Sequence, residues 1–203
     1  MKKALVIVAL LAISAVPVRA QGLEFSGGVN FAKLSGDDIS NAARNLGMNF
    51  GIDLVIPVGP IGLNLGGGWS QKGAEAVEMA STTVLDLSYF EIPVHLRFPL
   101  VGAGPVRLNL ILGPTIGINT GCELSVDAGA AADCAAGVDG FDVKKLDWSG
   151  AAGLGLSFRL GGLAYAGADL KYALGFSSID EAGMEDLKNR AFTLEGHFGF
   201  DVF

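Results

Sequence analysis

The sequence predicts an all-β fold, an eight-stranded antiparallel up-and-down transmembrane β-barrel. Three observations support this class. Half of the 203 residues are hydrophobic, yet beyond the N-terminal segment no apolar run is long enough for a transmembrane helix. Eight segments alternate apolar and polar residues with the period of two that strands show. The connections between them alternate between short and long, as in a barrel with turns on one side of a membrane and loops on the other.

The N-terminal segment is typical of a secretory signal peptide. Met1-Lys2-Lys3 precedes the apolar run 4–16, and Val18 and Ala20 are the small or apolar residues that cleavage requires. A membrane helix is the alternative, but the apolar run is shorter than the ~20 residues that a span needs. We expect residues 1–20 to be removed and residues 21–203 to form one barrel domain.

The charge balance argues against nucleic acid as a partner. Removal of Lys2, Lys3 and Arg19 would leave 11 of the 14 Lys and Arg residues against 21 Asp and Glu, a formal charge of −10. Phosphate backbones require a basic face, which such a chain does not offer.

The clearest strand ends at Phe98. Apolar residues occupy every second position, namely Phe90, Ile92, Val94, Leu96 and Phe98. The intervening positions carry Glu91, Pro93, His95 and Arg97. Ionisable groups are costly against lipid and acceptable in a polar lumen, so this strand is expected to separate the two.

Seven further segments have strand character. In order, the eight predicted strands cover residues 24–33, 46–57, 61–72, 83–98, 106–119, 146–160, 163–176 and 190–203. The expected lipid-facing sets include Met48, Phe50, Ile52, Leu54 and Ile56; Leu63, Leu65 and Trp69; Leu108, Leu110, Leu112, Ile116 and Ile118; Trp148, Leu154, Leu156 and Phe158; Leu170, Tyr172, Leu174 and Phe176; and Phe192, Leu194, Phe198 and Phe200.

The connections between these segments fall into two classes. Three are short and built from Gly and Pro, at 57–60, 99–105 and 161–162. The four longer and more polar connections cover 34–45, 73–82, 120–147 and 177–189. An even number of strands places both chain ends on the side of the short turns.

The opposite faces predict a polar lumen. Eight strands leave an interior that side chains fill, so we expect a salt-bridged interior and no open pore. Its predicted polar network comprises Glu91, His95, Arg97, Arg107, Arg159, Asp169, Lys171, Glu195 and His197, with Glu24, Asp53 and Asp201 as further inward carboxylates. An ion path or a small polar site is the functional alternative.

Metal binding and catalysis are not expected. His95, His197 and a carboxylate such as Glu91 would be a sensible metal set, but ordinary hydrogen-bonded histidines are the preferred interpretation, and no cofactor is predicted. The sequence has no nucleophile elbow, phosphate-binding loop or zinc-binding helix motif. The long loops contain no His, which argues against a His-based triad at their rim.

The longest loop contains both cysteines. Cys122 and Cys134 are twelve positions apart in a chain expected to be exported, so a disulfide is predicted over a redox or metal site. The long loops also carry a marked excess of Asp and Glu. This excess could attract divalent cations or a basic partner, or could remain solvated.

The strand 89–98 also resembles a known family. Its sequence Tyr-Phe-Glu-Ile-Pro-Val-His-Leu-Arg-Phe is similar to the Tyr-x-Glu-Ile-Pro-x-x-x-Lys/Arg strand of PorT-type outer-membrane β-barrel proteins, often labelled porin-family proteins. The resemblance extends to Gly113-Pro114, to the stretch 147–158, to the opening 27–31 and to the terminal aromatic residue. It implies insertion into outer-membrane lipid by the outer-membrane assembly machinery, with an assembly signal at Phe203. Phe203 departs from the pattern because it lies on the parity of Glu195 and Asp201, so it could face lipid only after a bulge.

Together these observations predict a monomeric integral protein of the Gram-negative outer membrane without catalytic activity. Its expected role is structural or interactive, through acidic outer loops that contact an unknown extracellular or periplasmic partner. A porin-like channel for small solutes is the first alternative. A soluble periplasmic barrel that carries an apolar ligand, as lipocalins do, is the second. That alternative requires the charged face to point outward.

Overall fold

The structure is a computed structural model that describes residues 22–36, 43–78, 81–127, 129, 131–134, 143–179 and 187–201. These residues form nine strands, namely β1 (Gly22–Ser35), β2 (Ala43–Val58), β3 (Ile61–Glu78), β4 (Ser81–Ala103), β5 (Val106–Val126), β6 (Ala132–Asp133), β7 (Leu146–Gly161), β8 (Ala164–Gly175) and β9 (Lys188–Asp201). No helix within these ranges has the length and hydropathy of a membrane span.

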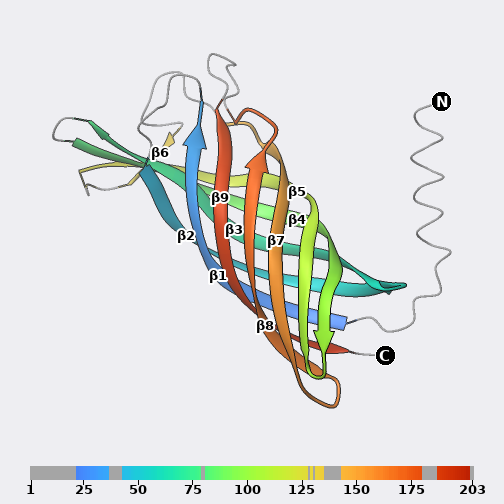
Figure 1. Cartoon of the computed structure of the whole chain (residues 1–203). Helices are drawn as coiled ribbons and strands as arrows, with labels where there is room; N and C mark the ends of the chain where they lie inside the picture. The colour runs from blue at the N-terminus through green and yellow to red at the C-terminus, as the bar shows by residue number, and fades with distance from the viewer. Residues whose placement is uncertain are drawn as a thin grey trace, which may run out of the picture.

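Eight of the strands close into a barrel (Figure 1). Neighbouring strands pair antiparallel from β1 to β5, then β5 with β7, and on through β8 to β9. The ring is completed by β1, which pairs with β9 from Gly22↔Asp201 to Ser35↔Lys188. The predicted eight-stranded antiparallel barrel is therefore confirmed. The ninth strand, β6, pairs only with the far end of β5.

The short connections gather at one end of the barrel, which we call the turn end (Figure 1). They join β2 to β3, β4 to β5 and β7 to β8. Gly59, Gly104 and Gly162 have φ of 64°, 59° and 56°, a left-handed conformation that glycine adopts without steric cost. The described ends at Gly22 and Asp201 pair at this same end. The opposite end is the loop end.

Inward and outward faces alternate as the sequence predicted. The outer surface is a broad apolar belt that includes Met48, Phe50, Leu154, Leu170 and Leu194, each at least 48 % exposed. Inward positions hold the buried polar residues Glu24, Asn30, Asn49, Asn64, Ser70, Lys72, His95, Thr115, Asp147, Ser149, Asp169, Asn189, Glu195 and His197. An apolar exterior around a polar interior is the reverse of a soluble carrier barrel, so the lipocalin-like alternative is wrong.

The predicted loop 73–82 is also wrong. β3 continues to Glu78 and β4 begins at Ser81, and the two remain paired through this segment. Gly73, where the predicted loop began, is instead a point of close approach between β3 and β4. A Cβ there would lie 1.9 Å from the carbonyl oxygen of Leu85. β5 likewise extends to Val126, past its predicted end at Asn119.

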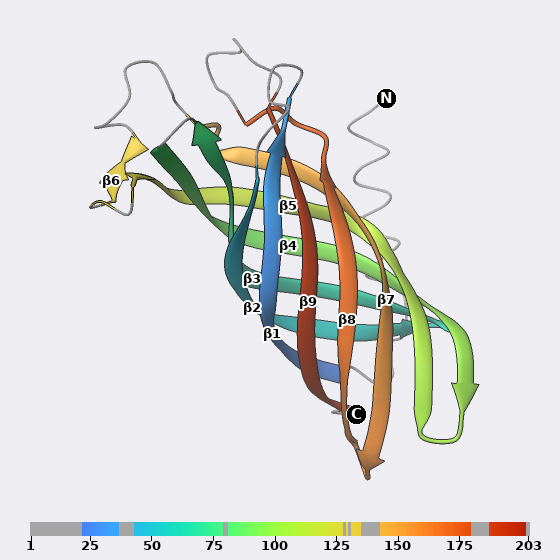
Figure 2. The same ribbon diagram turned by 60° about the vertical axis from the view of Figure 1, so that its left-hand side comes forward.

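These extensions form a sheet that rises beyond the barrel. We call residues 73–78 of β3, 81–88 of β4, 120–126 of β5 and all of β6 the projecting sheet; it leans to one side at the loop end (Figure 2). Cys122 and Cys134 form the predicted disulfide, with Cα atoms 5.5 Å apart. The bond ties the segment after β6 to β5.

One face of the projecting sheet packs over the mouth of the barrel. Leu87 and Tyr89 are fully buried there together with Leu34, Ala74, Ile179 and Leu187, a cluster that we call the loop-end cap. Leu85, Cys122 and Val143 pack against it. Burial of a leucine side chain contributes about 1.5–3 kcal/mol, so the hydrophobic effect holds these loop-end residues together.

Candidate functional site

The candidate site is the polar interior of the barrel. Most of the predicted network lies there. Asp169, Glu195, His95 and His197 are buried, and Glu91, Arg97 and Lys171 are largely so. Arg107 and Arg159 also point inward but are exposed, because their positions on β5 and β7 lie close to the turn end.

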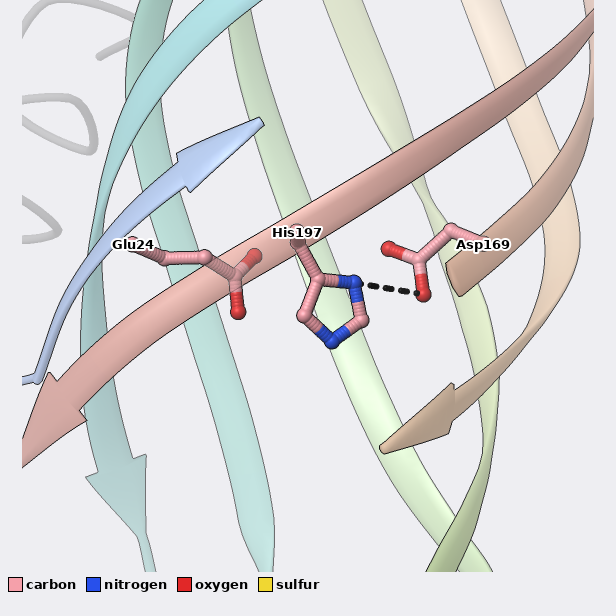
Figure 3. Close-up of side chains that lie close together, drawn as sticks. All are labelled: Glu24, Asp169 and His197. Carbon is pink, nitrogen blue, oxygen red and sulfur yellow. Dashed lines mark ion pairs between the residues drawn. The ribbon is translucent and has the colours of Figure 1, made fainter. Parts of the chain in front are cut away.

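The central feature is an ion cluster contributed by four strands. Arg97 on β4 donates from Nη2 to Glu24 Oε1 of β1 at 2.7 Å and to Asp169 Oδ2 of β8 at 2.8 Å. His197 Nδ1 on β9 lies 3.3 Å from Asp169 Oδ1 (Figure 3). One guanidinium thus bridges two buried carboxylates across the lumen, while the imidazole is placed beside the second carboxylate.

A glycine makes room for the histidine. Gly167 is the cross-strand neighbour of His197, and a Cβ at that position would lie 2.5 Å from His197 Nε2. Tyr165, two residues earlier on the same face, meets the His197 ring edge-on at 6.2 Å between ring centroids. The small residues that the sequence places at lumen positions therefore admit the larger polar side chains.

The same cluster contains three potential metal ligands. Atoms of Glu24, Asp169 and His197 lie within 4.8 Å of one another, the only such group found among the described residues. Arg97 already bonds both carboxylates, so a metal ion here would lie next to a guanidinium cation. The donors therefore fit a cluster bridged by arginine better than a metal centre.

The metal set considered from the sequence is not assembled. His95 Nε2 is 3.0 Å from Thr115 Oγ1, and Glu91 pairs with Lys72. These two residues thus have partners of their own, and His197 belongs to the cluster around Asp169.

Further ion pairs cross the interior above the cluster. Lys171 Nζ lies 2.6 Å from Glu195 Oε1. Lys72, which the sequence placed at the end of its strand without assigning it to the network, lies 2.5 Å from Glu91 Oε1 and over the ring of Tyr89. At the turn end Arg159 and Asp201 form a looser pair at 3.3 Å.

A layer of amides and hydroxyls lies outside the predicted network. Asn30 Nδ2 donates to Ser70 Oγ and to the Gln71 carbonyl, both at 2.9 Å. Its Oδ1 accepts from Asn49 Nδ2 at 3.1 Å and from Thr193 Oγ1 at 2.8 Å. Asn30 is the centre of this layer, and its inward parity was the available signal.

Two cavities lie along the lumen. The inner one has a volume of about 80 Å³ and is surrounded by the ion pairs and the amide layer. The other, about 670 Å³, occupies the turn end. Arg97 lines both and stands between them.

Comparison with known proteins assigns the family. The sequence matches the family described as "Outer membrane protein beta-barrel domain" over residues 19–181. The chain belongs to this family. This outer membrane protein beta-barrel domain is therefore an integral outer-membrane protein, and its exposed apolar belt faces lipid.

One solved structure shares the fold of this beta-barrel domain, and others are similar with lower scores. Neisserial surface protein A (NspA) is 14 % identical, with 88 % of this chain and 96 % of that chain covered and a TM-score of 0.52. Ail of Yersinia pestis, in complex with the heparin analogue sucrose octasulfate, is 17 % identical over 90 % and 100 % of the chains, with a TM-score of 0.46. OprG of Pseudomonas aeruginosa is 13 % identical over 90 % and 96 %, with a TM-score of 0.44. The search of curated proteins gave no match.

Three predictions made from the sequence are not tested by the family match. The signal peptide 1–20 and the assembly signal Phe203 lie outside the described residues. The PorT-type affinity of the strand 89–98 likewise stays a prediction, because the matched family is the broader one.

Proposed function

We propose that this outer membrane beta-barrel is a closed barrel that acts at the cell surface by binding a basic partner. The observation that carries the closed lumen is its double obstruction. The loop-end cap covers one end, and the bridge from Glu24 through Arg97 to Asp169 crosses the middle. The small-solute channel is the weaker candidate, because a solute would have to displace both.

The binding surface in this proposal is the outward face of the projecting sheet. Asp86, Glu123 and Asp133 are successive cross-strand neighbours on β4, β5 and β6, so their side chains share one face. Glu75 belongs to the same face, because it pairs with Val84, two positions from Asp86. Residues 73–88 and 120–134 contain six acidic residues and no Lys, Arg or His.

Like charges in cross-strand register destabilise an isolated sheet, which favours a role for them in binding. A cationic partner would offset their repulsion and gain from the local field. The disulfide supplies the rigidity that a binding surface needs, because it restrains β6 against β5.

Planar-bilayer recording of the purified protein tests closure. We expect no sustained discrete conductance, and stable unitary steps in membranes containing the protein would contradict the closed barrel.

Titration of the nanodisc-embedded protein with oligolysine tests the surface. We expect binding that weakens as salt rises and drops severalfold in the double variant Glu75→Gln, Glu123→Gln. Asp201→Asn, which removes an acid at the opposite end, is the control. Equal binding by the double variant and the control would remove the projecting sheet from the proposal.

A further inference from the structure

The turn-end cavity has the size and lining of a ligand site. Its volume of about 670 Å³ lies within the ~300–1,000 Å³ of typical small-molecule sites. Residues of all three short turns line it, among them Gly59, Gly104 and Leu163, so it opens at the turn end. None of the interactions that close the loop end involves it. We call this cavity the turn-end cup.

The two walls of the cup differ in chemistry. The wall from β2, β3 and β4 is apolar and presents Val55, Pro57, Ile61, Pro99 and Val101. The facing wall from β5 through β9 is polar and presents Arg107, Asn109, Ser157, Arg159, Tyr165 and Asp201. A molecule that fills the cup would contact an apolar surface on one side and hydrogen-bonding groups on the other.

The polar wall concentrates guanidinium groups. Arg107 makes no ion pair with any residue in the described part of the chain, and Arg159 is held only by the exposed 3.3 Å pair with Asp201. Their strand positions are adjacent, because Arg107 pairs with Ser157, two residues before Arg159 on the same face. Arg97 forms the floor, and its buried Nε has no hydrogen-bond partner among the described protein groups.

Arg97 is engaged by Glu24 and Asp169, and Arg159 by Asp201, so Arg107 on the wall is the cup's guanidinium without an ion pair among the described residues. Guanidinium groups bind carboxylate and phosphate oxygens in a forked geometry that lysine does not reproduce. We propose that the turn-end cup binds a small soluble amphipathic anion, whose carboxylate or phosphate head lies between Arg107 and Arg159 and whose apolar body lies against the β2–β4 wall.

The test uses 4-phenylbutyrate as the probe and its neutral amide, 4-phenylbutyramide, as the matched control ligand. Saturation-transfer NMR on the full protein in zwitterionic nanodiscs, with empty nanodiscs as the blank, measures both affinities. We expect saturable binding of the carboxylate and at least tenfold weaker binding of the amide. Equal affinities, or no binding of the carboxylate at millimolar concentration, would overturn the proposal.

Three substitutions locate the site. Arg107→Gln and Arg159→Gln should each weaken phenylbutyrate binding about tenfold, because each removes a charge-assisted hydrogen bond. Arg190→Gln removes the same charge at the loop end and should leave the affinity unchanged. Asp201→Asn should strengthen binding severalfold, since it removes the acid that competes for Arg159. A gain in affinity cannot arise from a folding defect. If Asp201→Asn does not bind more tightly and Arg107→Gln binds as tightly as the unsubstituted protein, the ligand lies elsewhere.

Lipid head groups carry the same phosphate chemistry as a soluble anion. A second experiment distinguishes a soluble anion from an anionic lipid. Phosphatidylglycerol added to the nanodiscs should leave phenylbutyrate binding unchanged, because the cup opens at the turn end rather than toward the bilayer. Competition by the lipid would overturn the assignment to a soluble anion.

Discussion

At the residue scale, Arg97 decides the stability of the interior. It is the single cation bonded to both Glu24 and Asp169, which are 2 % and 1 % exposed. Arg97→Met would leave two carboxylates buried in the lumen without a counter-charge. Loss of one member of a buried ion pair costs about 3–5 kcal/mol, so we expect the urea midpoint of the barrel to fall sharply.

The control for this prediction is Arg190→Met, which removes an arginine near the loop end that forms no ion pair with another described residue. The unboiled and boiled gel migration of both variants reports the folded fraction. Similar unfolding midpoints for the two variants would mean that water or protons replace the guanidinium at little cost.

Residue identity and parity predicted which side chains enter the lumen, but not which ones meet. Glu24 and Arg97 lie 73 positions apart in the chain, and their contact depends on strand tilt and register. The contact between His197 and Asp169 also depends on strand tilt and register. Alternation within one strand does not tell which residue of another strand its side chains will meet. Arg107 and Arg159 were assigned to a network whose depth the sequence could not give, and they lie at its open end.

At the scale of elements, membrane insertion depends on the apolar residues that each strand presents to lipid. Leu110 on β5 pairs between Phe98 and Leu154, and Ile92 on β4 pairs with Ile116, all on the apolar face. Leu110→Arg or Ile92→Arg would place a charge against lipid. Near the bilayer midplane such a charge destabilises a barrel by about 2–4 kcal/mol. We expect both variants to lose membrane yield in cell fractionation. Gly102→Arg, where a side chain meets no atom within 4 Å, is the matched control, and normal yield of all three would contradict the orientation of the faces.

The disulfide acts on one element only. β6 pairs with β5 through two residue pairs, and the bond between Cys122 and Cys134 holds the residue that follows it to β5. Their replacement by serine removes a cross-link between residues 12 positions apart. A cross-link over a loop of that size stabilises the folded state by roughly 3 kcal/mol. Hydrogen exchange should accelerate at Ala132 and Asp133 while the amides of β1 and β9 keep their protection. Loss of protection throughout the barrel would show that the projecting sheet supports the whole fold.

The strands were predictable because lipid on one side and a polar lumen on the other impose a strict period of two. The incorrect prediction of a loop at 73–82 has a physical reason as well. Beyond the membrane the outward residues no longer need to be apolar, so the alternation fades while the pairing of β3, β4 and β5 continues. Small and acidic residues then have the composition of a loop although the backbone remains extended.

At the scale of the whole molecule, the barrel is asymmetric. Its loop end holds the apolar loop-end cap, and its turn end holds the open cup. In intact cells, a polyethylene-glycol maleimide too large to cross the outer membrane should label Glu75→Cys and spare Arg107→Cys. Disruption of the outer membrane should make Arg107→Cys reactive, because its side chain is exposed to the turn end.

Labelling of Arg107→Cys in intact cells at the rate of Glu75→Cys would mean an open lumen or the inverse orientation. Tyr89→Cys separates these two outcomes. Tyr89 is fully buried in the cap, so only an open lumen would make that cysteine reactive before disruption.

The pairing of β1 with β9 also governs the order of events during biogenesis. β1 and β9 pair over fourteen register positions, so the barrel cannot close until β9 has been synthesised and has reached the membrane. Every earlier intermediate carries two unsatisfied sheet edges, which are templates for aggregation. We expect a chain built this way to need holding factors in transit, and a fragment that ends before Lys188 to be degraded rather than to close as a smaller barrel.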